Sequence, residues 1–85
     1  MPEISRFYGI IVRMFFNDHS PPHFHVEYQD YDATIDIIDG TVEGKMPRLA
    51  LKLIFEWLDL HKEELMENWE FSHNDKALNK IEPLK

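Results

Sequence analysis

The sequence predicts an α+β fold, an antiparallel β-meander of about four strands with one long C-terminal α-helix packed on its apolar face. Residues 4–44 are rich in β-branched and aromatic side chains and are interrupted by turn signals. Residues from about 47 to 70 then run without glycine and, after Pro47, without proline. A chain of 85 residues has room for a single core, so we expect one domain over residues 1–85, closed by a polar tail over 72–85.

The first strand is expected in the segment FYGIIVRMFF, residues 7–16. Its even-numbered residues from Ile10 onward form one apolar face. Ile11 and Phe15 project from the other face, beside Arg13. Two prolines then require a loop before the next strand, because proline is excluded from helix interiors and central strands.

The segments HFHVEY and ATIDII predict the next two strands, joined by a turn centred on Gln29 and Asp30. This register pairs His23 with Asp36 and makes one face of the pair apolar and the other polar, as a half-buried antiparallel pair requires. The dipeptide Asp39-Gly40 predicts a tight hairpin turn, which places Val42 opposite Ile37 and Glu43 opposite Asp36.

The expected helix has more apolar surface than one sheet face can cover. Two explanations remain open for this surplus. The tail can fold back over it with Leu78, Ile81 and Leu84. Alternatively, the surplus is an interface with a second copy or another protein, formed by Phe55 and Trp57 of the helix and by Ile11 and Phe15 of the first strand.

Composition excludes several classes of function. The chain has no cysteine, so disulfides, thiolate metal sites and cysteine nucleophiles are excluded. A formal net charge of −7 disfavours unaided nucleic-acid binding. Neither a membrane-spanning apolar run nor a signal-peptide pattern is visible, so we expect a cytoplasmic protein without membrane association.

The main chemical signal is the segment HSPPHFH, which holds three of the five histidines. His23 and His25 are two residues apart on a strand, so their rings project from the same face. They can bind one divalent ion (Zn, Mn or Fe), with Asp36 as third ligand from the neighbouring strand and His19 as a possible fourth. Glu27 is a candidate either for a group that supports the metal ligands from behind or for a general base. The alternative is a solvated polar face in which His23 and Asp36 form only a cross-strand charge pair. No cofactor other than such a metal is indicated.

Small cationic sites are a further candidate. Arg6 and Arg13 can contact an anion beside the His23 face, and Arg48 can do so at the start of the helix, where the helix dipole favours negative charge. The alternative is that these side chains only solvate the surface of an acidic protein.

The segments MPEISRFYGIIVRMFFNDHSPPHFHVEY and EGKMPRLALKLIFEWLDLHKEELMENWE, with the closing KIEPL, resemble the small bacterial family catalogued as domain of unknown function 4160. The turn at Gln29-Asp30 departs from the glycine that many relatives have there. The resemblance implies a free-standing cytoplasmic protein, often encoded beside a protein of the family domain of unknown function 2442. That arrangement implies a type II toxin–antitoxin-like pair in which this family supplies the toxin.

Two functional hypotheses follow. The first is a partner-dependent, toxin-like protein held inactive by a cognate antitoxin-like protein. The second is a metal-dependent hydrolase or nuclease that uses His23, His25 and Asp36. Both can be true of one protein, since a toxin can be an enzyme.

Overall fold

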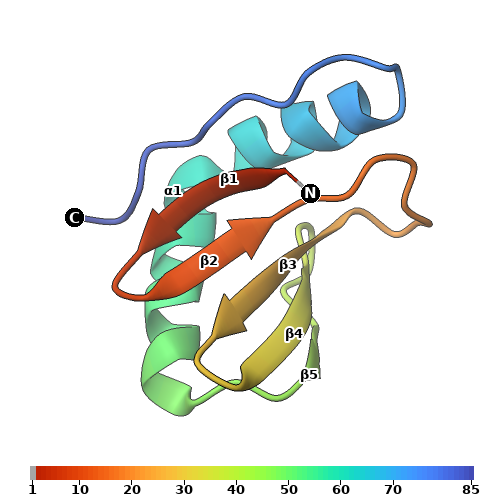
Figure 1. Cartoon of the computed structure of the whole chain (residues 1–85). Helices are drawn as coiled ribbons and strands as arrows, with labels where there is room; N and C mark the ends of the chain where they lie inside the picture. Colours follow the sequence, from red (N-terminus) through yellow and green to blue (C-terminus); the bar gives the residue numbers. More distant parts are fainter. Residues whose placement is uncertain (1) are drawn as a thin grey trace.

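The computed structural model describes residues 2–85 as a five-stranded antiparallel sheet with one helix against it (Figure 1). The strands follow one another in chain order across the sheet. The predicted α+β meander with a C-terminal helix is therefore confirmed. The elements are β1 (Glu3–Phe7), β2 (Ile10–Arg13), β3 (His23–Tyr28), β4 (Tyr31–Asp36), β5 (Val42–Gly44) and α1 (Arg48–Ser72).

The sheet has one strand more than predicted because the first predicted strand is really a hairpin turn followed by β2. Tyr8 and Gly9 have positive φ angles of 51° and 81°, as the central residues of a type I′ turn do. The turn pairs Phe7 with Ile10 and places β1 at the edge of the sheet. Residues 14–16 continue the chain beyond the end of β2.

The register of β3 on β4 is the predicted one, with His23 opposite Asp36 and Phe24 opposite Ile35. The predicted register of β5 is wrong by two residues, because Val42 lies opposite Ile35 instead of Ile37. The cause is local: the Asp36 carboxylate accepts hydrogen bonds from two backbone N–H groups of the turn, at 2.8 and 2.9 Å. These hydrogen bonds end β4 at Asp36 and widen the turn. Because the register of β5 differs from the prediction by two residues, an even number, every side chain stays on its predicted face of the sheet.

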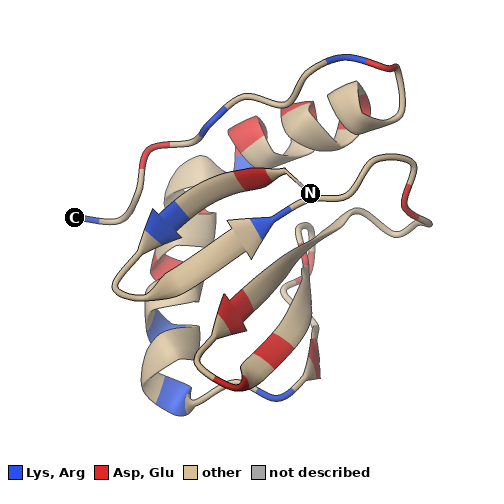
Figure 2. Cartoon of the chain, viewed as in Figure 1, with Lys and Arg blue, Asp and Glu red and all other residues tan. Residues whose placement is uncertain are grey.

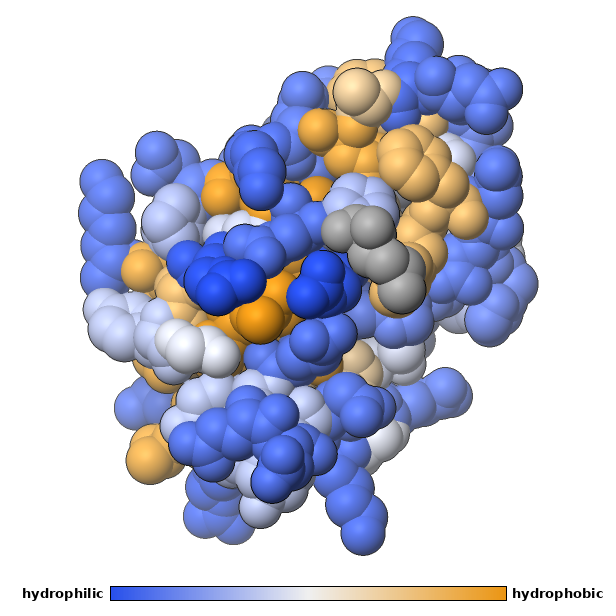
Figure 3. Space-filling model, viewed as in Figure 1, coloured by the Kyte–Doolittle hydropathy of each residue, from blue (hydrophilic) through white to orange (hydrophobic). Residues whose placement is uncertain are grey.

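The sheet face opposite the core, which we call the open face, is polar. Its side chains come from β2, β3, β4 and β5 and include His25, Glu27, Asp32, Thr34 and Glu43. Figure 2 marks acidic residues on β3, β4 and β5, and Figure 3 shows a largely hydrophilic surface with apolar residues among it.

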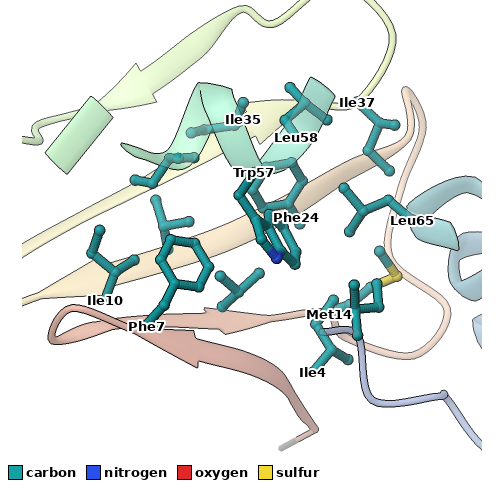
Figure 4. Close-up of a cluster of buried hydrophobic side chains, with 14 of the residues drawn as sticks. Ile4, Phe7, Ile10, Met14, Phe24, Ile35, Ile37, Trp57, Leu58 and Leu65 are labelled. Atoms are coloured by element: carbon teal, nitrogen blue, oxygen red, sulfur yellow. The ribbon is translucent and has the colours of Figure 1, made fainter. Parts of the chain in front are cut away.

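The other face of the sheet packs against α1 around Trp57 and Phe24, whose ring centroids are 5.8 Å apart (Figure 4). Alternate residues of β2, β3 and β4 complete this core with Leu58 and Leu65 of the helix. The helix bends at His61, which has φ −125° and ψ 22°. No helix of the described chain is long and apolar enough to cross a membrane.

The tail folds back over the helix and β1, as the first explanation for the apolar surplus proposed. Ile81 is buried, and its N–H donates to the Ile4 carbonyl oxygen at 2.8 Å. Trp57 Nε1 donates to the Glu82 carbonyl oxygen at 2.8 Å. The prediction that Trp57 belongs to an exposed partner interface is therefore wrong, because its side chain is fully buried within this chain.

Candidate metal centre

Three side chains converge where the Pro-Pro loop meets β3. Asp18 lies in the loop, and its Oδ2 is 2.9 Å from His23 Nε2 and 3.2 Å from His25 Nε2. The three potential ligand atoms all lie within 4.8 Å of one another. Since β3 projects both imidazoles from one face, the loop needs to supply only the carboxylate to complete a three-ligand set.

The His23 ring is oriented by the backbone of the loop. Its Nδ1 lies 2.8 Å from the Pro21 carbonyl oxygen, which can only accept, so Nδ1 donates there. Nε2 is thereby directed at Asp18. Metal-binding histidines are commonly oriented in this way, with the second ring nitrogen bonded to a carbonyl or carboxylate. The ring is almost fully buried and lies 5.2 Å, centroid to centroid, from Trp69 of α1.

His25 is half-buried and packs against Phe15, whose ring meets it edge-on at a centroid distance of 4.3 Å. This contact gives Phe15, a predicted interface residue, a role in holding the cluster. The His23 and His25 rings lie 5.3 Å apart and also meet edge-on. Packing therefore limits rotation of both imidazoles before any ligand binds.

Asp18 is held in its ionised form. Partial burial acts to raise its pKa, but hydrogen bonds from the His25 side chain, the His19 backbone N–H and the His23 side chain outweigh burial and lower the pKa to about 2. The His19 N–H donates to Asp18 Oδ1 at 2.9 Å, which leaves Oδ2 to the two imidazoles. The carboxylate is thus charged and directed at both rings throughout the physiological pH range.

The structure brings a fourth histidine, His73, to the loop that holds Asp18. His73 follows the end of α1, and its Nε2 lies 2.8 Å from the Asp18 backbone carbonyl oxygen. Its Nδ1 lies 2.9 Å from the Trp69 carbonyl oxygen, so both ring nitrogens face acceptors and both donate when the ring is protonated. The bond to the Trp69 carbonyl and then the bond to the Asp18 carbonyl raise the pKa of His73, and they outweigh a smaller opposing effect of desolvation. The Asn17 N–H adds a bond to the Ser72 carbonyl oxygen at 3.1 Å, so the loop is tied to the helix end.

Asp36, the carboxylate predicted as third ligand, lies opposite His23 but outside the cluster. Its Oδ1 accepts the two turn N–H groups of Ile38 and Asp39. Within residues 2–85, the ligand atoms that converge are those of Asp18, His23 and His25. His19 stays near, with Nδ1 3.0 Å from Asp18 Oδ1, but its side chain is 85% exposed. The sequence did not identify Asp18 as a ligand, because it lies in a loop, where the two-residue periodicity of a strand does not indicate which way a side chain points.

The predicted anion contacts do not form one cationic site. Arg6 pairs with Glu3 at 2.7 Å, and Arg13 pairs with Glu27 at 3.0 Å. The ion pair with Arg13 thus occupies the carboxylate of Glu27, the candidate general base. Arg48 is the exposed first residue of α1.

The other predicted interface residues are half-buried. Ile11 lies on the open face beside Glu27, opposite it in the register of β2 on β3. Phe55 packs partly against the core from α1.

A hollow of about 450 Å³ opens beside the cluster. Its walls include all three candidate ligands, Thr34 of β4 and Thr41 of the β4–β5 turn. A second hollow of about 400 Å³ continues over the open face and shares His25, Thr34 and Glu43 with the first. A metal ion on the cluster would therefore have space for a further, exchangeable ligand.

Comparison with known proteins adds the family. Among the curated proteins and among the solved structures, none matches this chain. The profile of the family described as Domain of unknown function (DUF4160) matches residues 9–70, a span that includes all three candidate ligands. Since this match covers well over half of the 85 residues, the chain belongs to the DUF4160 family.

Proposed function

We propose that this protein binds one divalent metal ion through Asp18 Oδ2, His23 Nε2 and His25 Nε2, and that the bound ion supports hydrolysis. The single observation that carries the proposal is the convergence of these three atoms within 4.8 Å, with the His23 ring oriented from behind by the Pro21 carbonyl. Two imidazoles and one carboxylate suit Zn²⁺, Fe²⁺ and Mn²⁺.

The chemistry follows from the number of ligands. Asp18, His23 and His25 would hold the ion with three ligands, which is the number typical of catalytic rather than structural zinc sites. An ion held there would supply activation of water for nucleophilic attack at neutral pH. The adjoining hollow of about 450 Å³ accommodates the substrate beside these ligands. Because Arg13 engages Glu27, we do not assign Glu27 the role of general base.

The test is metal stoichiometry of the untagged protein, measured by elemental analysis after zinc loading and dialysis and by calorimetric titration. We expect one zinc per wild-type chain and loss of this zinc in Asp18→Asn and in His23→Ala/His25→Ala. Asp36→Asn is the matched control, since it removes a neighbouring carboxylate charge outside the cluster, and we expect it to retain the zinc.

Two results would contradict the proposal. One is a wild-type protein without stoichiometric metal. The other is equal metal content in the wild type and in the double histidine variant, both shown to be folded by circular dichroism.

A second candidate function, partner dependence of a toxin-like protein, is supported by a different observation. Three large apolar side chains are strongly exposed: Leu49 (75%), Leu60 (68%) and Ile38 (59%). The first two lie on α1 and the third lies in the β4–β5 turn. If these side chains adjoin in one apolar patch, that patch would favour contact with another protein.

The test of this second proposal is expression of the chain in a bacterium, alone and together with its neighbouring gene product. We expect slower growth when the chain is alone and co-purification when both are present. Equal growth in both cases without co-purification would count against a toxin-like role.

A further inference from the structure

The open face of the sheet offers more room than a metal ion and its water need. The two adjoining hollows, of about 400 and 450 Å³, share the side chains of His25, Thr34 and Glu43. One hollow lies beside the candidate metal centre and the other beside the β3–β4 turn, and we call the two adjoining hollows the depression. Each is within the size range of pockets that hold small organic ligands.

Carboxylates dominate the part of the depression that lies away from the metal centre. Asp30 and Asp32 line the hollow of about 400 Å³ with Glu27, and Glu43 lines both hollows. On the side of the metal centre, Asp39 lines the hollow of about 450 Å³. Figure 2 shows this concentration of acidic residues on β3, β4 and β5. The pKa of Asp39 is lowered because the backbone N–H and the hydroxyl of Thr41 both donate to its carboxylate, so it stays charged.

Positive charge is nearly absent from the same depression. Within the described chain, no lysine or arginine lines either hollow, and the neighbouring Arg13 is paired with Glu27 at 3.0 Å. A phosphate-bearing ligand would therefore meet uncompensated carboxylates, which repel it. Nucleic acid is disfavoured here, and so is the nuclease form of the hydrolase hypothesis.

Two aromatic side chains complete the hollow of about 400 Å³. Phe15 lines it from the segment after β2, and Tyr31 lines it from the start of β4, where its side chain is exposed. Aromatic faces attract ammonium and guanidinium groups through the ring quadrupole. Carboxylates and aromatic rings in one hollow are the lining that organic cations prefer.

We propose that the substrate held on the open face is an organic cation, a chain bearing primary ammonium or guanidinium groups. Its charged groups lie among Asp30, Asp32 and Glu43, and its neutral part extends toward Asp18, His23 and His25. The inference rests on the proposed function for its link to chemistry, but the recognition itself can be measured without turnover. The same chemistry is offered by a basic peptide segment and by a free polyamine.

The test is calorimetric or NMR titration of the full-length wild-type chain, metal-free and zinc-loaded, in low-salt buffer. The probes are spermidine, an acetylated and amidated tetra-arginine peptide, and a ten-nucleotide single-stranded RNA. We expect one or both cationic probes to bind with millimolar or tighter affinity that weakens as salt is added, and the RNA not to bind. Preference for the peptide over spermidine would identify a peptide substrate, and the reverse preference would identify a polyamine-like one.

Charge-neutralising variants locate the site. We expect Asp32→Asn/Glu43→Gln to bind the cationic probe about tenfold more weakly, since two neighbouring charges are removed. Glu63→Gln/Glu67→Gln changes the net charge equally on the exposed surface of α1, and we expect its affinity to stay within twofold of wild type. A parallel zinc titration should give unchanged zinc binding in both variants.

The outcomes separate the two proposals. Three results would overturn the proposal of a cationic substrate even if zinc binds. They are binding of the RNA, no binding of either cationic probe to the wild type at 10 mM, and equally weakened binding of the cationic probe in both double variants. Failure to bind zinc with normal, site-specific cation binding would overturn the metal centre alone.

Discussion

His73 Nε2 donates a hydrogen bond to the backbone carbonyl oxygen of Asp18 at 2.8 Å, across 55 residues of sequence. The bond joins the end of α1 to the loop that supplies the carboxylate of the candidate metal centre. Trp69 lies between His73 and His23, with ring centroids at 4.6 and 5.2 Å. The position of Asp18 therefore depends on the helix end as well as on its own loop.

The first prediction concerns His73 as a positioning residue. We expect His73→Ala to weaken zinc binding about tenfold, because outer partners of metal ligands typically contribute 10- to 100-fold in metal affinity. Competition with a chromophoric zinc chelator measures the affinity, and thermal unfolding of the metal-free form checks that the fold persists. His61→Ala removes a histidine that contacts Glu64 at 2.6 Å, and is the control. Equal zinc affinity in wild type and His73→Ala would show that the bond does not position Asp18.

The second prediction is a pH dependence of stability due to His73. Hydrogen bonds to the Trp69 and Asp18 carbonyl oxygens raise its pKa, so the folded state favours the charged ring. Its contribution to stability is complete below the ordinary pKa of about 6.5 and is lost as the pH rises through the higher folded value. Urea unfolding of the metal-free chain at pH 5.5 and 8.5 measures the loss. We expect a smaller difference between these pH values in His73→Ala than in wild type.

The third prediction is acid destabilisation due to Asp18. Despite the opposing effect of burial, its hydrogen bonds lower its pKa to about 2, below about 3.9 in an unfolded chain. The resulting stabilisation is present above pH 3.9 and is lost as the pH falls through 3.9 toward 2. At pH 6 it amounts to about 2 kcal/mol, so we expect Asp18→Asn to be less stable by about that amount in metal-free urea unfolding. Asp75→Asn, an exposed turn residue, should change stability little. An acid transition with the same midpoint in Asp18→Asn would exclude this role.

The fourth prediction separates core from surface on α1. Trp57 is fully buried and bonds to the Glu82 carbonyl, so we expect Trp57→Ala to lower the free energy of unfolding by about 3–5 kcal/mol. Leu60 is 68% exposed, and Leu60→Ala should stay within about 0.5 kcal/mol of wild type. Chemical denaturation measures both. A small loss in Trp57→Ala would mean that the tail does not close over this side chain.

The fifth prediction concerns Gly44 at the end of β5. Its φ is +108°, and a Cβ atom there would lie 2.6 Å from the Asp32 carbonyl oxygen and 2.8 Å from the Ala33 Cα. Both contacts are with backbone, which cannot rotate away. We expect Gly44→Ala to destabilise the protein by about 2 kcal/mol or more in urea unfolding. Gly40→Ala, where the nearest atom belongs to the Phe55 ring at 3.3 Å, should cost less.

Several features of this chain follow from local pattern alone. The alternation in HFHVEY and ATIDII predicts the register of β3 on β4, because a slip of one residue would move every apolar side chain into solvent. The same alternation predicts that His23 and His25 share a face. The uninterrupted segment after Pro47 predicts the long helix, observed over Arg48–Ser72.

Other features depend on turn conformations and turn hydrogen bonds, which the alternation of apolar and polar residues along the strands does not reveal. The turn at Tyr8-Gly9 divided one predicted strand, and the Asp36 carboxylate, by accepting two turn N–H groups, shifted β5 by two residues. These hydrogen bonds direct the Asp36 carboxylate to the turn instead of to His23.

By itself, the sequence determined the polar face and the two imidazoles on it, because the two-residue period of a strand is a local property of the backbone. The tertiary structure alone decided the third ligand. Asp18 belongs to a loop without a period, and its place is set by its bonds to the strand histidines and to His73 beyond the end of the helix. The tertiary structure likewise decided that Trp57 is core, since the tail that covers it is joined to it by a contact 25 residues apart in sequence.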